Sequence, residues 1–149
     1  MAYDTSPTET RTDTTVAPRY RRYLAGYLAL TVVGTGVLLV LAKHSSNLLA
    51  AVELVGGGSL LVVASVATIP AFYKDATGLD ADPRSPDWKP YVAFVVGSPL
   101  VVYLAVAYVT MANVAVVVAG VAVVVAAFEA TAVYLFRRRK YVGSAAAES

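Results

Sequence analysis

The sequence predicts an all-α fold, an integral membrane bundle of four transmembrane helices with the N and C termini in the cytoplasm. Its composition and the pattern of its apolar residues lead to this expectation. Of the 149 residues, 58% are hydrophobic and only 15% are charged, a balance far from that of water-soluble domains. The apolar residues gather in four blocks, each about as long as a helix that spans the hydrocarbon core of a bilayer.

The apolar blocks define the domain organisation. We expect residues 1–20 to form a disordered polar tail, because Thr, Ser, Asp and Glu dominate it without an apolar period. Residues 21–142 are expected to form the transmembrane domain, and residues 143–149 a C-terminal tail. The helices are expected at about residues 24–42, 48–73, 90–111 and 114–136, with a cytoplasmic loop at residues 74–89.

A short polar link joins the first two predicted helices. Residues 24–42 carry no charge and would be about 28 Å long as a helix, which matches one hydrocarbon core. Asn47 suits the N-cap of the second helix, and Pro70 suggests that this helix ends near Phe72. The glycines at positions 34, 36 and 56–58 lie inside these helices without the lysine of a phosphate loop, which favours close helix packing.

The predicted loop at residues 74–89 is rich in aspartate. It holds Asp75, Asp80, Asp82 and Asp87. A calcium loop would need a central glycine and a terminal glutamate, and both are missing. We therefore expect a solvated acidic loop.

The last two predicted helices form an antiparallel hairpin. Pro90 fits the first turn of a helix, and Pro99 predicts a kink inside it. Only a few residues around Asn113 separate this helix from the last one, so the two must run antiparallel. Many of these residues are valines, but blocks of about 20 continuous apolar residues lack the alternation of barrel strands, and helices satisfy their own backbone in lipid.

Basic residues determine the predicted orientation. With the N terminus inside, eleven of the twelve Lys and Arg residues are cytoplasmic and only Lys43 lies outside. Most of the Tyr residues and the Trp also fall near the inner interface. We expect a multi-pass protein of the cell membrane. Arg21 and Arg22 also resemble a twin-arginine export signal, but no small-x-small cleavage site precedes Lys43, which favours an uncleaved helix.

Glu129 and Glu53 are the candidate functional residues inside the membrane. Glu129 precedes Arg137 by eight residues, which places it about 12 Å inside the inner boundary. It continues a helical seam of small residues, so we expect it to face protein or water. The seam consists of Ala115, Ala119, Ala122, Ala126 and Glu129. Two interpretations stay open, a proton or cation site and a neutral carboxyl that hydrogen-bonds across the bundle, and the second is favoured.

Glu53 lies closer to the outer end of its helix, about 9 Å from it. It can reach the interface or meet Lys43 and His44, and we expect interface anchoring rather than transport. The two carboxyls should differ in depth by roughly 15 Å, which excludes a direct pair unless the helices shift or waters connect them.

The residue inventory offers little for catalysis. There is no cysteine, and His44 is the single histidine. Disulfides, thiolate metal sites and cysteine nucleophiles are thereby excluded, and neither a His-Glu-x-x-His motif nor a serine elbow is present. We expect no enzyme activity, no catalytic, cofactor-binding or metal-binding residues, no cofactor and no nucleic-acid partner. We expect the protein to lie in the lipid bilayer and to associate with further copies of itself or with a larger membrane protein.

Three segments carry a resemblance to a known group of proteins. They are Pro70 with Tyr73 and Asp75, then residues 87–91 (Asp-Trp-Lys-Pro-Tyr), then residues 133–143. In these segments the chain resembles uncharacterised small four-helix membrane proteins of halophilic archaea, which pair a Tyr-x-Asp turn with a Trp-x-Pro-x-x-Tyr-like helix entry and a Tyr-Leu-Tyr-Arg-Arg-like stop. Here the entry reads Trp-Lys-Pro-Tyr and Phe136 stands in the stop. The resemblance implies a cell-membrane protein in a salty cytoplasm and brings no assigned activity.

A weaker likeness is to the four-helix family associated with flipping lipid-linked sugars. It covers length, topology and the basic residues after the last helix, while the Asn-Phe before that family's basic stretch is absent. We also expect a set of inner-interface anchors near lipid headgroups. These are Trp88, Tyr91, Arg137, Arg138, Arg139 and Lys140.

Three functions are compatible with these features. The leading hypothesis is a non-enzymatic structural or accessory subunit of a membrane assembly, because small-residue seams are present and catalytic groups are not. The alternatives are a small proton- or cation-coupled transporter that uses Glu129, and a protein that assists translocation of lipid-linked sugars.

Overall fold

The computed structural model describes residues 17–44, 48–77 and 87–145, and nearly all of them are helical. The helices are α1 (Ala17–His44), α2 (Leu48–Val66), α3 (Thr68–Thr77), α4 (Lys89–Val109) and α5 (Ala112–Ala145). Among the described residues there is no strand. The expected N-terminal tail lies outside these residues except for its last four, which already belong to α1. Asp80, Asp82 and most of the C-terminal tail also lie outside them.

Four stretches of the described chain are long and apolar enough to cross a membrane. They are Arg19–His44, Ala51–Thr77, Lys89–Val109 and Ala112–Lys140. The predicted bundle of four transmembrane helices is thereby confirmed, and the chain is a multi-pass membrane protein.

The second span is divided into α2 and α3 by a turn at Ala67. Pro70 explains the break, because a proline cannot donate to the carbonyl four residues earlier and its ring clashes with it. That carbonyl belongs to Val66, where α2 ends. Across this turn, Thr68 Oγ1 donates a 2.6 Å hydrogen bond to the Ser65 carbonyl oxygen. The proline disturbs only the preceding turn, so the span continues to Thr77 instead of ending near Phe72.

The hairpin of α4 and α5 is tight. α4 runs without interruption through Pro99, and its C-cap Thr110 is extended, with φ −133° and ψ −179°. The Thr110 backbone N–H still donates to the Val106 carbonyl oxygen at 2.8 Å. Only Thr110 and Met111 separate the two helices, and Asn113 already lies inside α5.

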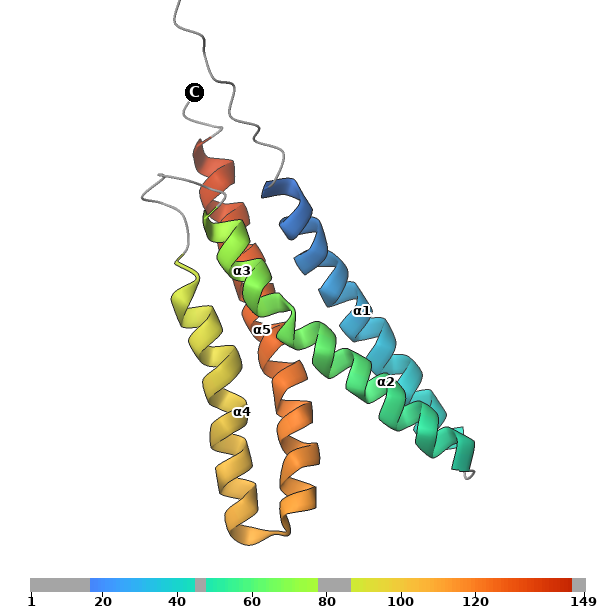
Figure 1. Cartoon of the computed structure of the whole chain (residues 1–149). Helices are drawn as coiled ribbons and strands as arrows, with labels where there is room; N and C mark the ends of the chain where they lie inside the picture. Colours follow the sequence, from blue (N-terminus) through green and yellow to red (C-terminus); the bar gives the residue numbers. More distant parts are fainter. Residues whose placement is uncertain (1–16, 45–47, 78–86, 146–149) are drawn as a thin grey trace, which may run out of the picture.

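Figure 1 shows two hairpins that meet at one end of the molecule and diverge toward the other. We call the first the basic end: α1 and α4 begin there, α3 and α5 finish there, and it carries Arg21, Lys74, Lys89 and Arg137. We call the opposite end, with the Thr110–Met111 turn, the turn end. The α1–α2 pair packs closely at two glycines, because a Cβ on Gly34 or Gly57 would lie 3.2 Å or 2.7 Å from a leucine side chain. The expected close packing is thus found at Gly34 and Gly57, whereas a Cβ at Gly36, Gly56 or Gly58 would meet nothing within 4 Å.

The buried apolar core lies toward the basic end. Its members are Leu24, Tyr27, Ala71, Phe72, Tyr91, Val95, Ala127, Ala130 and Tyr134. Toward the turn end large apolar side chains remain exposed, for example Leu39 at 66% and Val101 at 65%. Such surfaces suit contact with lipid or with other membrane helices. The polar side chains that the core encloses are therefore concentrated near one end of the bundle.

Candidate functional site

Asp75 lies at the centre of a buried polar cluster. Its side chain is completely inaccessible, although the sequence placed it in a solvated acidic loop. That expectation was wrong for Asp75, because α3 continues for five residues beyond Phe72 and turns this carboxyl toward α5. Asp87, by contrast, is exposed as expected and accepts a hydrogen bond from the Lys89 backbone N–H at 3.1 Å.

Two side chains of α5 contact the Asp75 carboxyl. The Tyr134 hydroxyl donates a 2.8 Å hydrogen bond to Oδ2. Arg138 Nη1 lies 3.3 Å from Oδ1 and forms an ion pair with it, without the alignment of a hydrogen bond. The positive charges of Arg138 and of Arg21 on α1 both act on this carboxyl. We call Asp75, Tyr134 and Arg138 the α3–α5 cluster.

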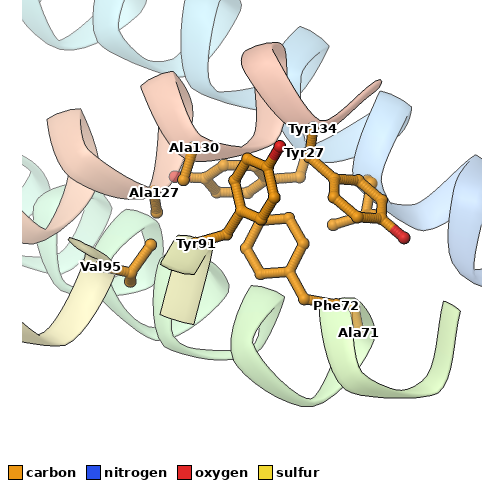
Figure 2. Packing of buried hydrophobic residues seen from close by; sticks show 9 residues of the cluster. Tyr27, Ala71, Phe72, Tyr91, Val95, Ala127, Ala130 and Tyr134 are labelled. Carbon is orange, nitrogen blue, oxygen red and sulfur yellow. The ribbon is translucent and has the colours of Figure 1, made fainter. Parts of the chain in front are cut away.

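Aromatic rings pack around Tyr134, one member of this cluster (Figure 2). The ring of Phe72 meets that of Tyr134 edge-on at a centroid distance of 5.2 Å, and Tyr91 from α4 meets Tyr134 in the same way at 5.2 Å. The Phe72 and Tyr91 rings are stacked at 6.0 Å. Aromatic pairs at these distances add to the free energy gained by burying the rings. The polar cluster is thus enclosed by helices of both hairpins.

A second polar contact joins the hairpins closer to the middle of the bundle. Tyr27 Oη lies 2.8 Å from Ser65 Oγ and 3.3 Å from the Val124 carbonyl oxygen, which connects α1, α2 and α5. In lipid such contacts matter, because a polar group without a partner in hydrocarbon costs free energy. The contact with Val124 joins α1 of one hairpin to α5 of the other.

Several buried polar atoms near the cluster have no hydrogen-bond partner among the described residues. They are Tyr91 Oη, Thr131 Oγ1, Arg138 Nε and Nη1, and Asp75 Oδ1. Thr131 lies one turn before Tyr134 on α5, and the Tyr91 and Tyr134 rings are in contact. A carboxyl, a guanidinium and neighbouring hydroxyls at one place can hold or release a proton, or hold the two hairpins together.

Glu129 does not face the interior of the bundle. It is exposed, although Ala115 and Ala126 of the expected seam are buried. Glu129 lines an open groove of about 270 Å³ between α4 and α5, together with Phe94, Val133 and Arg137. Within the described part of the chain it makes no hydrogen bond or ion pair. Of the two expected surroundings, protein or water, the interior of this single chain does not supply the first, because the helix rotation that buries Tyr134 and Arg138 turns Glu129 outward.

Glu53 is exposed on α2, toward the turn end. It forms no ion pair with Lys43 or His44, both of which are exposed, and His44 Nδ1 lies 3.0 Å from the Val40 carbonyl oxygen instead. The structure does not bring Glu53 together with Glu129.

The predicted interface anchors divide into two groups. Trp88 is half-buried at the start of α4 and meets the ring of Tyr73 edge-on at 5.2 Å, and Arg137, Arg139 and Lys140 are exposed at the basic end. Tyr91 is only 7% exposed and Arg138 only 9%, and both point into the bundle. Tyr91 therefore packs in the core instead of standing at the surface, and Arg138 pairs with Asp75.

The α3–α5 cluster was missed from the sequence, although one signal of it is present. Thr131, Tyr134 and Arg138 follow one another at steps of three and four, which marks a polar stripe on one face of α5. No local signal marks Asp75, which follows Lys74 close to a polar segment. Within residues 17–44, 48–77 and 87–145 no group of three or more His, Cys, Asp or Glu side chains could hold a metal ion.

Comparisons with protein families, with curated proteins and with solved structures found no match.

Proposed function

We propose that this multi-pass membrane protein is a non-enzymatic structural or accessory subunit of an assembly in the cell membrane. Its basic end faces the cytoplasm in this proposal, because basic residues beside short loops are retained on that side. Arg21, Lys74, Lys89 and Arg137 all lie at that end. The single observation that carries the assembly function is the position of Glu129.

Glu129 is exposed on the outer surface of the bundle at a depth that belongs to hydrocarbon. It lies eight residues before Arg137, or about 12 Å along α5. A carboxyl facing lipid at that depth costs a few kcal/mol, and a short side chain cannot reach the headgroups from there. A protein partner that covers Glu129 and bonds to it removes this cost. The exposed face of α5 is therefore more stable when a partner covers it than when it faces lipid.

The apolar surface around Glu129 supports the same proposal. Val121, Val125 and Val133 share its side of α5 and are 59%, 49% and 46% exposed. Beside them the α4–α5 groove offers a shallow depression that a helix can fill.

Purification in a mild detergent followed by native mass spectrometry tests this function. We expect the chain to be recovered in a complex larger than the monomer, and we expect Glu129→Leu to reduce the yield of that complex. Glu53→Leu is the control, because Glu53 is also exposed but lies toward the turn end. A lone monomer, under conditions that preserve other membrane complexes from the same cells, would refute the proposal.

Proton-coupled transport is the second candidate, and the α3–α5 cluster is the observation that favours it. Asp75 is the one carboxyl that is fully buried among the described residues, and it lies where the two hairpins meet. If the Asp75 carboxylate takes up a proton, it loses its negative charge and with it the ion pair with Arg138. The contact between α3 and α5 would then change. This version of the hypothesis assigns the proton to Asp75 and not to Glu129.

A comparison of two variants tests the transport hypothesis. Proteoliposomes with a pH-sensitive dye inside would report proton movement driven by an imposed gradient. Under this hypothesis Asp75→Asn abolishes the flux and Glu129→Gln leaves it unchanged. Absence of flux in the wild-type protein, or equal flux in Asp75→Asn, would count against transport.

A further inference from the structure

We propose that the partner covering Glu129 is a second copy of this chain, docked on the α4–α5 face about a two-fold axis, with the two Glu129 side chains hydrogen-bonded to each other. This inference rests on the proposed assembly function and names its partner.

The depth of Glu129 in the membrane favours a second copy of the chain as its partner. All copies of a membrane protein insert with the same orientation, so a two-fold axis perpendicular to the bilayer places every residue at its own depth in the other copy. A two-fold axis that passes beside Glu129 therefore brings two identical carboxyls together at the same level. No other residue of the described chain is required to supply the contact, and no vertical shift is needed.

Carboxyl chemistry makes this contact self-complementary. A protonated carboxyl is both a hydrogen-bond donor and an acceptor, whereas two ionised carboxylates side by side repel each other. Two Glu129 side chains that hold two protons, or share one, satisfy each other in hydrocarbon, where water is absent. The protons come from the aqueous phase before the helices associate, and no covalent bond changes.

The surface around Glu129 can form such an interface. Val121, Val125, Glu129 and Val133 follow one another every four residues and form one exposed ridge along α5. Phe94, 45% exposed, stands across the groove on α4. Under two-fold symmetry the α5 ridge of each copy can pack into the α4–α5 groove of the other copy.

Glu53 does not call for the same arrangement. It is exposed, but it lies close to the turn end, where a side chain can reach the interface. The face that contains Glu129 is therefore the part of the surface where burial by a partner relieves the largest cost.

Single-cysteine crosslinking tests the inference directly, because the chain contains no cysteine. Val125→Cys and Val133→Cys are expected to give a covalent homodimer when membranes that contain the full chain are treated with copper phenanthroline. Val33→Cys on α1 is the control, since it is 65% exposed and about as far from the basic end as Val125. A depth-matched control is required because the thiolate forms less readily in hydrocarbon.

A second pair of variants tests the role of the carboxyl. In the Val125→Cys background, Glu129→Leu should weaken dimerisation roughly 5–30-fold, and Glu129→Gln should retain most of it, because a carboxamide also donates and accepts. Both variants are at an exposed position, so the fold is not expected to change.

The outcomes separate this inference from the proposed function. A disulfide-linked dimer from positions 125 and 133 and not from position 33 supports it. Equal crosslinking at position 33, or none at 125 and 133, overturns it. If crosslinking is absent while native mass spectrometry still finds the chain bound to a different protein, the assembly function holds and the homodimer is refuted. If both experiments return only monomer, both proposals fail.

Discussion

The Tyr134 hydroxyl donates a 2.8 Å hydrogen bond to the Asp75 carboxyl and so connects α5 to α3. Neither side chain is accessible to the surroundings, and the two residues are 59 positions apart in the sequence. The bond crosses from one hairpin to the other at the end where the hairpins meet. Its loss should therefore change the stability of the whole bundle, more than that of a single helix.

Removing the Tyr134 hydroxyl tests this contact. Tyr134→Phe keeps the ring in its aromatic contacts but leaves Asp75 Oδ2 without its donor, so we expect a loss of about 1–3 kcal/mol in the free energy of unfolding. Unfolding by SDS in mixed micelles, followed by circular dichroism, measures it. Tyr108→Phe is the control, because Tyr108 is 92% exposed. Equal stability of the two variants would show that the hydrogen bond contributes nothing.

The ion pair between Asp75 and Arg138 gives a second prediction, in which Arg138 is the test position and its neighbour Arg139 is the control. Arg138→Gln should destabilise the protein by about 3–5 kcal/mol, because the buried Asp75 carboxyl loses its ion-pair partner. Arg139→Gln should have an effect near zero, because Arg139 is exposed.

The double variant shows whether the two groups act on each other. Asp75→Asn combined with Arg138→Gln should recover part of the stability that Arg138→Gln loses, since no uncompensated charge remains. Strictly additive losses would mean that Asp75 and Arg138 contribute independently.

Close packing of α1 on α2 gives a third prediction. A Cβ at position 57 would lie 2.7 Å from Leu38 Cδ2, whereas nothing lies within 4 Å of a Cβ at position 56. Gly57→Leu should therefore overpack the α1–α2 contact and cost about 1–3 kcal/mol of stability, while Gly56→Leu should be tolerated. The same SDS titration compares them. A larger loss for Gly56→Leu would contradict the packing described for this pair.

The orientation can be measured with a thiol reagent that does not cross membranes. If the basic end is cytoplasmic, Met111→Cys at the turn end should react in intact cells, and Thr77→Cys at the end of α3 should react only after the cells are opened. Both positions are exposed, with Met111 at 80%, and the chain has no other cysteine. Labelling of Thr77→Cys in intact cells would reverse the proposed orientation.

The sequence by itself determined the four spans and the tight α4–α5 hairpin. Span length and apolar content are properties of continuous segments, and a connection of two residues leaves antiparallel neighbours as the only arrangement. Pro70 also signalled an interruption of the second span, although its effect was on the preceding turn and not on the end of the helix. These features needed no knowledge of how the helices pack.

The tertiary structure alone decided which polar residues are buried. Asp75 reads locally as the beginning of a polar loop, and Glu129 reads as part of a small-residue seam, yet the first is enclosed and the second is exposed. The reason is rotation about the helix axis. Packing of Tyr134 and Arg138 against α3 fixes the rotation of α5, and one helix cannot turn Arg138 inward and Glu129 inward at the same time. That choice depends on residues 59 positions apart in the chain, and local sequence patterns do not contain it.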